Sequence, residues 1–316
     1  MDQKATKQSR FQPKEGAQKV PLLFRWAVKD LTDPITIRRV QIAQSMLLAL
    51  VFIAASIWVY YEFVKGPTGV ELRTTMIEAA GGTEAWDGIK QGAFTRTQRF
   101  YEENGIELRK KVETFFFQKT DQGTKLMIKA TNKDGKEIWV GQDDQGFWAS
   151  ENTKSIDPLA AAKDEGMMCD SKFCDPMCAA TMAFYRFSMP FKLNDPGVIP
   201  ESNGLATLNQ AEMNILDITY KPEVGKDKWV FYSDKKEGLI YKMEYHNQSD
   251  NGHTRAEEVY FSDHQTVNGI TFAHTWTRYH GNGLVMEKYT YSDVNFDLDM
   301  AEDFFDRSAK RQLAGI

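Results

Sequence analysis

The sequence predicts a mainly β protein: a half-open, curved antiparallel β-barrel with helices packed in its concave face, preceded by one transmembrane helix. Three observations lead to this prediction. An uncharged apolar run lies near the N-terminus, a long region of alternating apolar and polar residues carries regularly spaced Xaa-Gly turns, and a helix-like stretch interrupts that region near its middle.

The apolar run covers residues 40–64 and carries no formal charge between Ile42 and Tyr61. About 20 helical residues, each rising about 1.5 Å, are enough to cross the hydrocarbon core of a bilayer. A cleaved signal peptide is the alternative, but the charged region before the run is too long and no small-residue cleavage site follows. The sequence therefore predicts an uncleaved membrane-spanning helix.

The charges that flank this run predict its orientation. Residues 1–39 form a basic tail with nine Lys and Arg residues and four acidic residues, a net charge of +5. The positive-inside rule places this tail in the cytoplasm, with Trp58, Tyr60 and Tyr61 at the opposite interface. The tail is read as a topogenic signal, with docking to a cytoplasmic or membrane partner as the alternative.

The remaining chain has an acidic balance. The whole chain has a net charge of −5, so the part beyond the basic tail carries −10, which argues against nucleic acid as its partner. Residues 65–70 form a linker that reaches roughly 20 Å when fully extended. We expect the exported domain, residues 71–307, to stay close to the membrane, with residues 308–316 as a short C-terminal tail.

The exported domain is predicted to begin with a short helix pair. Leu72, Met76 and Ile77 recur at helical spacing, and the glycine pair at 81–82 provides a stop. A second short helix is expected around Trp86.

A β region follows, punctuated by turn dipeptides. Asn-Gly and Asp-Gly pairs accept the positive φ of tight hairpins, so neighbouring strands should pair as antiparallel meanders with one apolar face. The Xaa-Gly pairs end at Gly105, Gly123, Gly135, Gly146, Gly238, Gly252, Gly269 and Gly283. The predicted strands cover residues 93–101, 106–118, 125–131, 137–142, 146–150, 207–220, 228–233, 239–245, 255–261, 270–279 and 284–294.

The β pattern is interrupted between residues 157 and 200. Asp157-Pro158 opens an Ala-rich helix over residues 159–163, and Asp175-Pro176 opens a second helix that continues through Tyr185. Apolar helices in the middle of a meander are expected to pack into the concave face of the curved sheet.

Three segments resemble a known family. They are residues 79–86 (AAGGTEAW), 184–197 (FYRFSMPFKLNDPG) and 294–305 (VNFDLDMAEDFF). Together they are similar to the LolA/LolB-like periplasmic lipoprotein-carrier superfamily, especially its outer-membrane lipoprotein-sorting relatives, over about residues 71–307. The resemblance implies a half-open barrel whose cavity takes acyl chains, and a location in the bacterial inner membrane with a periplasmic C-terminal domain. It does not assign the family's cavity arginine among Arg96, Arg99 and Arg109.

Two departures from a soluble carrier shape the functional prediction. An uncleaved helix and a short linker would prevent the domain from ferrying cargo across a periplasm, so it should extract, hold or present lipid at the membrane. We expect a non-enzymatic domain that binds a hydrophobic ligand, either membrane lipid or lipoprotein acyl chains. The alternative is a structural or assembly subunit that uses the fold as a docking platform within a larger inner-membrane complex.

All three cysteines, Cys169, Cys174 and Cys178, fall in one short segment. Disulfides persist in exported compartments, so one bridge is expected from Cys169 to Cys174 or to Cys178, with an odd thiol left over. The alternatives are three free buried cysteines and a soft-metal site. The thioether donors for such a site would be Met167, Met168, Met177 and Met182.

No motif for catalysis is present. The sequence has no Gly-x-Ser-x-Gly elbow, no phosphate-cradling loop and no Gly-x-Gly-x-x-Gly fingerprint, and its histidines lack His-Glu-x-x-His pairing. The five histidines are His246, His253, His264, His274 and His280. We therefore predict no catalytic residues, no resident metal and no cofactor.

Overall fold

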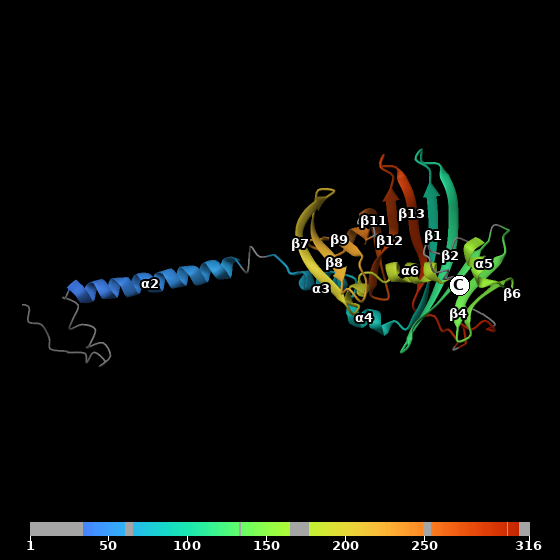
Figure 1. The fold of residues 1–316 in the computed structure, drawn as a ribbon, viewed down its shortest axis with the longest axis horizontal. Coiled ribbons are helices and arrows are strands. Elements are labelled where there is room, and N and C mark those ends of the chain that lie inside the picture. Colours follow the sequence, from blue (N-terminus) through green and yellow to red (C-terminus); the bar gives the residue numbers. More distant parts are fainter. Residues whose placement is uncertain are drawn as a thin grey trace, which may run out of the picture. The chain divides into compact units, whose positions relative to one another are not determined.

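The computed structural model describes residues 34–60, 66–132, 134–164, 177–248, 254–301 and 303–309. The chain divides into two compact units, Met1–Gly66 and Pro67–Ile316. The first unit contains helix α2 (Pro34–Val59), drawn in blue in Figure 1. Within α2, Gln41–Val59 has a mean hydropathy of 2.2 and is long and apolar enough to cross a membrane.

The second unit is built on one antiparallel sheet of 13 strands. Its spatial order is β6-β5-β4-β3-β2-β1-β13-β12-β11-β10-β9-β8-β7, so β6 and β7 are its two edges and the barrel is not closed (Figure 1). The predicted half-open, mainly β architecture is therefore confirmed. The strands are β1 (Gln91–Tyr101), β2 (Glu107–Thr120), β3 (Gly123–Thr131), β4 (Glu137–Asp143), β5 (Gly146–Glu151), β6 (Lys154–Ile156), β7 (Val198–Leu208), β8 (Ala211–Tyr220), β9 (Lys228–Asp234), β10 (Ile240–Gln248), β11 (Thr254–Val267), β12 (Ile270–Tyr279) and β13 (Val285–Asn295).

The turns explain why most strand boundaries could be predicted and two could not. Gly105 and Gly283 have positive φ at the tips of the β1–β2 and β12–β13 hairpins, as the Asn-Gly pairs predict. The prediction of one strand over residues 207–220 was wrong, because Asn209 and Gln210 both adopt positive φ and form a tight turn between β7 and β8 without glycine. A similar turn precedes β6, which the sequence analysis also missed.

The helices of the second unit are short. Helix α3 starts with a capping box in which Thr68 and Glu71 exchange hydrogen bonds with each other's backbone N–H groups, so the first orphan donors are satisfied. Its first residue is Gly69, so the last two residues of the predicted linker belong to this helix. The helices are α3 (Gly69–Ala79), α4 (Gly82–Gly88), α5 (Pro158–Asp164), α6 (Cys178–Phe187) and the 3-10 helix η2 (Phe191–Asn194).

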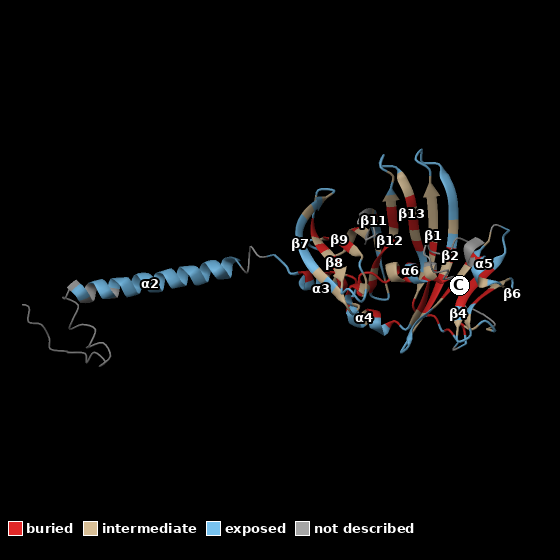
Figure 2. Cartoon of the chain, viewed as in Figure 1, coloured by how far each residue is buried: buried red, intermediate tan, exposed pale blue. Residues whose placement is uncertain are grey.

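The main core lies between these helices and the concave face of the sheet, which we define as the face covered by α6 (Figure 1). Alternation places Phe94 of β1 and Phe115 of β2 on this face, where both are buried. Figure 2 shows the buried residues continuing along the neighbouring strands. The expectation that the central helices pack into the concave face is confirmed.

The opposite, convex face has its own smaller core. Phe116 and Trp148 project there and meet the C-terminal segment that contains Phe304 and Phe305. The indole N–H of Trp148 donates a hydrogen bond to the Phe305 carbonyl oxygen at 3.1 Å. This segment covers apolar surface that would otherwise face water.

Candidate ligand pocket on the concave face

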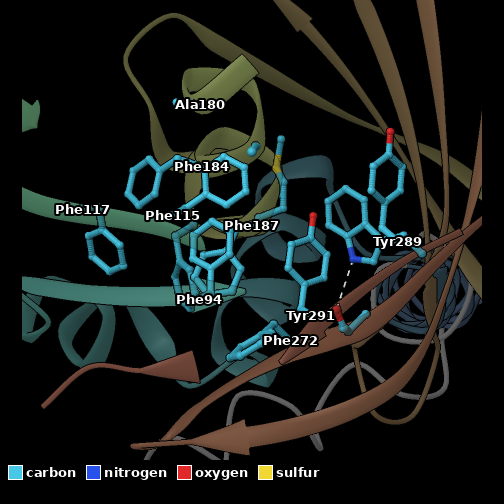
Figure 3. Packing of buried hydrophobic residues seen from close by; sticks show 14 of the residues in the cluster. Phe94, Phe115, Phe117, Ala180, Phe184, Phe187, Phe272, Tyr289 and Tyr291 are labelled. Atoms are coloured by element: carbon cyan, nitrogen blue, oxygen red, sulfur yellow. Dashed lines mark hydrogen bonds between the residues drawn. The ribbon is translucent and has the colours of Figure 1, made fainter. Parts of the chain in front are cut away.

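One half of the concave face, over β1–β6, is filled by aromatic side chains, as Figure 3 shows. Phe187 at the end of α6 stacks on Phe94 with ring centroids 4.0 Å apart, and Phe94 stacks on Phe115 at 5.0 Å. Phe117 packs against Phe184 of α6 at 4.9 Å. Offset aromatic contacts of this kind stabilise a packed core, so we call this region the filled half.

The other half, over β9–β12, retains an apolar pocket beside the same helix. It begins where Phe187 ends, and Met76 of α3 closes it from another side. Its lining residues are Met76, Ala80, Phe187, Met189, Pro190, Phe231, Leu239, Ile240, Phe261, His264, Thr271, Phe272, Ala273, Trp276 and Tyr291. We call this the concave pocket.

The concave pocket is narrow. The space between its atoms, counted together with its opening to solvent, is about 500 Å³, but only about 40 Å³ of it is wide enough for the centre of a water molecule. One water needs roughly 10–15 Å³ by that measure, so the pocket has room for a few waters. An alkyl chain would enter only if lining side chains moved. Met76 and Met189 are unbranched and polarizable, which makes them adaptable lining for an incoming chain.

His264 is the one lining side chain of the described pocket that could become positively charged near neutral pH. Burial lowers its pKa below the ordinary 6.5, although the hydrogen bond between its Nε2 and the Ile240 carbonyl oxygen, at 3.0 Å, opposes that shift. His264 is therefore neutral at pH 7, with Nε2–H donating to the carbonyl. The pocket lining then carries no formal charge, which favours apolar ligands.

Beyond the concave pocket, the same face becomes polar. Arg96 of β1 and Lys111 of β2 both form ion pairs with Glu113, at 2.5 and 2.7 Å, and the Glu113 side chain is fully buried. Burial alone would raise the pKa of Glu113, but the two neighbouring cations hold it below the usual 4.5. Burial also lowers the pKa of Lys111. The carboxylate thus stays ionised between two cations.

A second polar group lies on β12 and β13. Glu287 accepts hydrogen bonds from the Tyr289 hydroxyl at 2.6 Å and the Gln98 amide at 2.6 Å. Arg278 pairs with Glu287 at 3.0 Å and with Glu257 at 3.4 Å. We call the region formed by these residues and the Arg96–Glu113–Lys111 cluster the polar wall. The concave face is therefore amphipathic, with an apolar pocket followed by a charged wall.

The structure places the predicted cysteine cluster only in part. Cys178 is the first residue of α6 and its sulfur is in a disulfide. Cys169 and Cys174 lie outside the described residues, as do Met167 and Met168. The pairing and the soft-metal alternative therefore stay predictions. In the described part of the chain, no group of three His, Cys, Asp or Glu side chains could hold a metal ion.

The three candidate arginines differ in location and in contacts. Arg96 is buried on the concave face, and its guanidinium lies 4.8 Å from the centre of the Phe115 ring. Arg99 points to the convex side and pairs with Glu107, while Arg109 lies over the Phe100 ring. A single sequence could not make this distinction, since strand register decides which face each arginine occupies.

Sequence reasoning missed the location of the concave pocket and the role of residues that follow α6. The motif over residues 184–197 contains Phe187, Met189 and Pro190, three of the lining residues. The aromatic residues of this motif were the one sequence feature that could have indicated a pocket lining here. The sequence did not show that one half of the face would be filled and the other left open.

A family model described as a family of unknown function (DUF6503) matches residues 175–274, about a third of the chain. That match covers α6, the residues after it and β7–β11, and so includes much of the concave pocket. No curated protein matches the chain.

Several solved structures resemble the chain at low sequence identity. A DUF1329 family protein from Desulfovibrio piger is 12% identical, with a TM-score of 0.49, covering 75% of this chain and 95% of that one. An outer membrane lipoprotein-sorting protein domain from Vibrio parahaemolyticus is 13% identical, with a TM-score of 0.48 and coverage of 76% and 96%. A LolA superfamily protein from Nitrosomonas europaea is 13% identical, with a TM-score of 0.46 and coverage of 76% and 98%. The chain is thus similar to LolA-superfamily proteins over about three quarters of its length.

Proposed function

We propose that this chain is a membrane-anchored, non-enzymatic protein whose concave pocket binds the alkyl part of a membrane lipid or of a lipoprotein acyl chain. The observation that supports this most strongly is the uncharged, largely apolar pocket beside Phe187, next to the filled half of the concave face. Burial of alkyl groups releases about 0.8 kcal/mol per CH₂ and requires no reactive residue.

The proposed anchor is the apolar helix Gln41–Val59. In this proposal the basic N-terminal tail stays in the cytoplasm of a bacterial cell, the helix spans the inner membrane and the β domain faces the periplasm. Lipid would then reach the pocket directly from the bilayer, without a soluble carrier stage.

The ligand test uses the full chain, purified in a mild detergent and analysed by native mass spectrometry. We expect lipid or acylated peptide to co-purify, and the Ala273→Leu change, which adds volume at a lining position, to remove it. Ala206→Leu on the partly exposed edge strand β7 is the matched control and should keep the ligand. Equal lipid occupancy in all three proteins would contradict the assignment of the pocket.

A second candidate function is a docking platform in a membrane complex, with the cavity filled by the protein's own side chains. The observation in its favour is the small amount of free space in the pocket. Chemical crosslinking in membranes would recover a stoichiometric protein partner if this candidate is correct. It would also predict a lipid-free pocket in the native mass spectrum.

A further inference from the structure

Arg186 differs from the other described cations of the concave face because no described residue pairs with it. It is the residue before Phe187 in α6, and its side chain is half-buried. Its buried Nε has no hydrogen-bond partner, and its guanidinium forms no ion pair with any residue in the described part of the chain. The buried Nε–H is therefore an unsatisfied hydrogen-bond donor, which carries a free-energy cost that a bound acceptor would remove.

The surroundings of Arg186 locate it at the boundary between the concave pocket and the polar wall. Its charge acts on the hydroxyl groups of Tyr245, Tyr289 and Tyr291, where it opposes the rise in pKa that burial causes at each. Tyr291 also lines the concave pocket. Figure 3 shows the hydroxyl groups of Tyr289 and Tyr291 pointing the same way, away from Phe272.

The carboxylates of this region are already engaged. Glu113 is held by Arg96 and Lys111, Glu287 and Glu257 by Arg278, and Asp227 accepts a hydrogen bond from Tyr245 at 2.9 Å. Rotation of Arg186 toward one of them would compete with an existing partner. The described residues therefore leave no carboxylate free for Arg186, and a ligand can supply the counter-ion.

We infer that Arg186 binds the anionic head group of an amphiphile whose alkyl chain lies in the concave pocket. A carboxylate or a phosphate monoester fits, since the planar guanidinium can donate two parallel hydrogen bonds to either group. Tyr291, which lies within reach of the charge of Arg186, lines the pocket together with Phe187, so a head group at Arg186 would place the first carbons of the chain against this part of the lining. This inference rests on the proposed function and specifies the class of ligand.

The test compares probes with the same chain and different heads. The full chain in phosphatidylcholine nanodiscs is titrated with dodecanoic acid, dodecyl phosphate and dodecanol, and binding to empty nanodiscs is subtracted. We expect the two anionic probes to bind about tenfold more tightly than the alcohol, the size of one charge-assisted hydrogen-bonded contact. Acetate or inorganic phosphate at the same concentration should not displace them, because neither has an alkyl chain.

Variants assign the preference to Arg186. Arg186→Gln should remove the preference for anionic heads and leave the affinity for dodecanol unchanged, whereas Arg186→Lys should retain part of it. Arg99→Gln, on the convex side, is the matched control and should behave as the wild type. Circular dichroism checks that each variant is folded. If Arg186→Gln does not fold, the comparison is made with Arg186→Lys, which should show a reduced preference for anionic heads.

Each outcome has a distinct meaning. Equal affinity for acid and alcohol would overturn the inference and leave the proposed lipid binding intact. A preference that persists in Arg186→Gln would overturn the assignment to this residue. If none of the three probes binds, the proposed function itself fails.

Discussion

The two halves of the concave face use the same sheet and the same helix for different purposes. Over β1–β6, Phe94, Phe115 and Phe187 close the space with stacked rings, and Phe94 and Phe115 are essentially inaccessible to solvent. Over β9–β12, the lining of Phe261, Ala273 and their neighbours leaves a pocket. The filled half is therefore closely packed, and the pocket half retains apolar surface that its own side chains do not cover completely.

This difference follows from side-chain size and spacing rather than from backbone architecture. Strands on both sides present apolar residues at every second position, as alternation requires. The two halves differ in the segment that packs against the strands. Phe184 and Phe187 of α6 pack on the filled half, whereas the turn that contains Met189 and Pro190 covers the pocket half. A packed core costs energy to perturb, and a loosely filled pocket tolerates change.

The largest expected effect comes from truncating matched phenylalanines. Phe94→Ala should lower the free energy of unfolding by about 3–5 kcal/mol, because it leaves a cavity in close packing. Phe261→Ala, which enlarges an existing pocket, should cost at least about 1 kcal/mol less, since less packing is lost. Urea denaturation followed by tryptophan fluorescence measures both. Equal losses would remove the distinction between the halves.

The second prediction adds volume instead of removing it. Ala180 is fully buried in the filled half, so Ala180→Leu should destabilise the protein by about 1–3 kcal/mol through overpacking. Ala273→Leu adds volume at a pocket-lining position and should cost less than about 1 kcal/mol. The same denaturation experiment compares the two variants. A larger loss of stability for Ala273→Leu would show that the pocket cannot accommodate the added volume.

The third prediction concerns pH. All five histidines follow residue 245, so none lies on β1–β6 or α6. Burial lowers the pKa of His264 and His274 in the folded state, so below pH 6.5 the unfolded chain binds protons that the folded chain does not. Stability should therefore fall as the pH decreases through 6.5 and level off below the folded-state pKa values. His264→Gln should flatten this dependence, and an unchanged slope would contradict the assignment.

The smallest effect is expected outside both halves. Arg307 forms a two-pronged ion pair with Asp143, 2.7 Å at its shorter contact, and this interaction lowers the pKa of Asp143 to about 2. Because Arg307 is exposed to solvent, Arg307→Ala should shift the urea midpoint less than any of the changes above. Binding of apolar probes should not change, and a loss of binding would indicate that the convex face controls the pocket.

Most of the fold could be predicted because its signals are local. Turn glycines fix hairpins through their positive φ, and alternation within strands is visible in a single sequence. Asn209 and Gln210 were misread because asparagine and its neighbour can adopt the same conformation without glycine. Because this turn has no glycine, the β7–β8 hairpin was predicted as one strand, and the edge strand β7 was missed.

The candidate site could not be predicted to the same degree because it depends on tertiary packing. Nothing in the segment around Arg186 shows that the arginine lacks a counter-ion, since its potential partners come from β2, β11 and β13. The division of the concave face likewise depends on where α6 rests on the sheet. Only the presence of apolar helices at the concave face followed from the sequence.

The central claim is that the pocket half takes up an alkyl chain. The most direct measurement is photocrosslinking of the full chain in nanodiscs with a hexadecyl probe that carries a diazirine near its end, followed by peptide mapping. We predict labelling of peptides from β9, β11 and β12 that contain Phe231, Phe261 and Trp276, and its loss in Ala273→Leu but not in Ala206→Leu. Labelling confined to the apolar helix α2, with none in the β domain, would contradict the account.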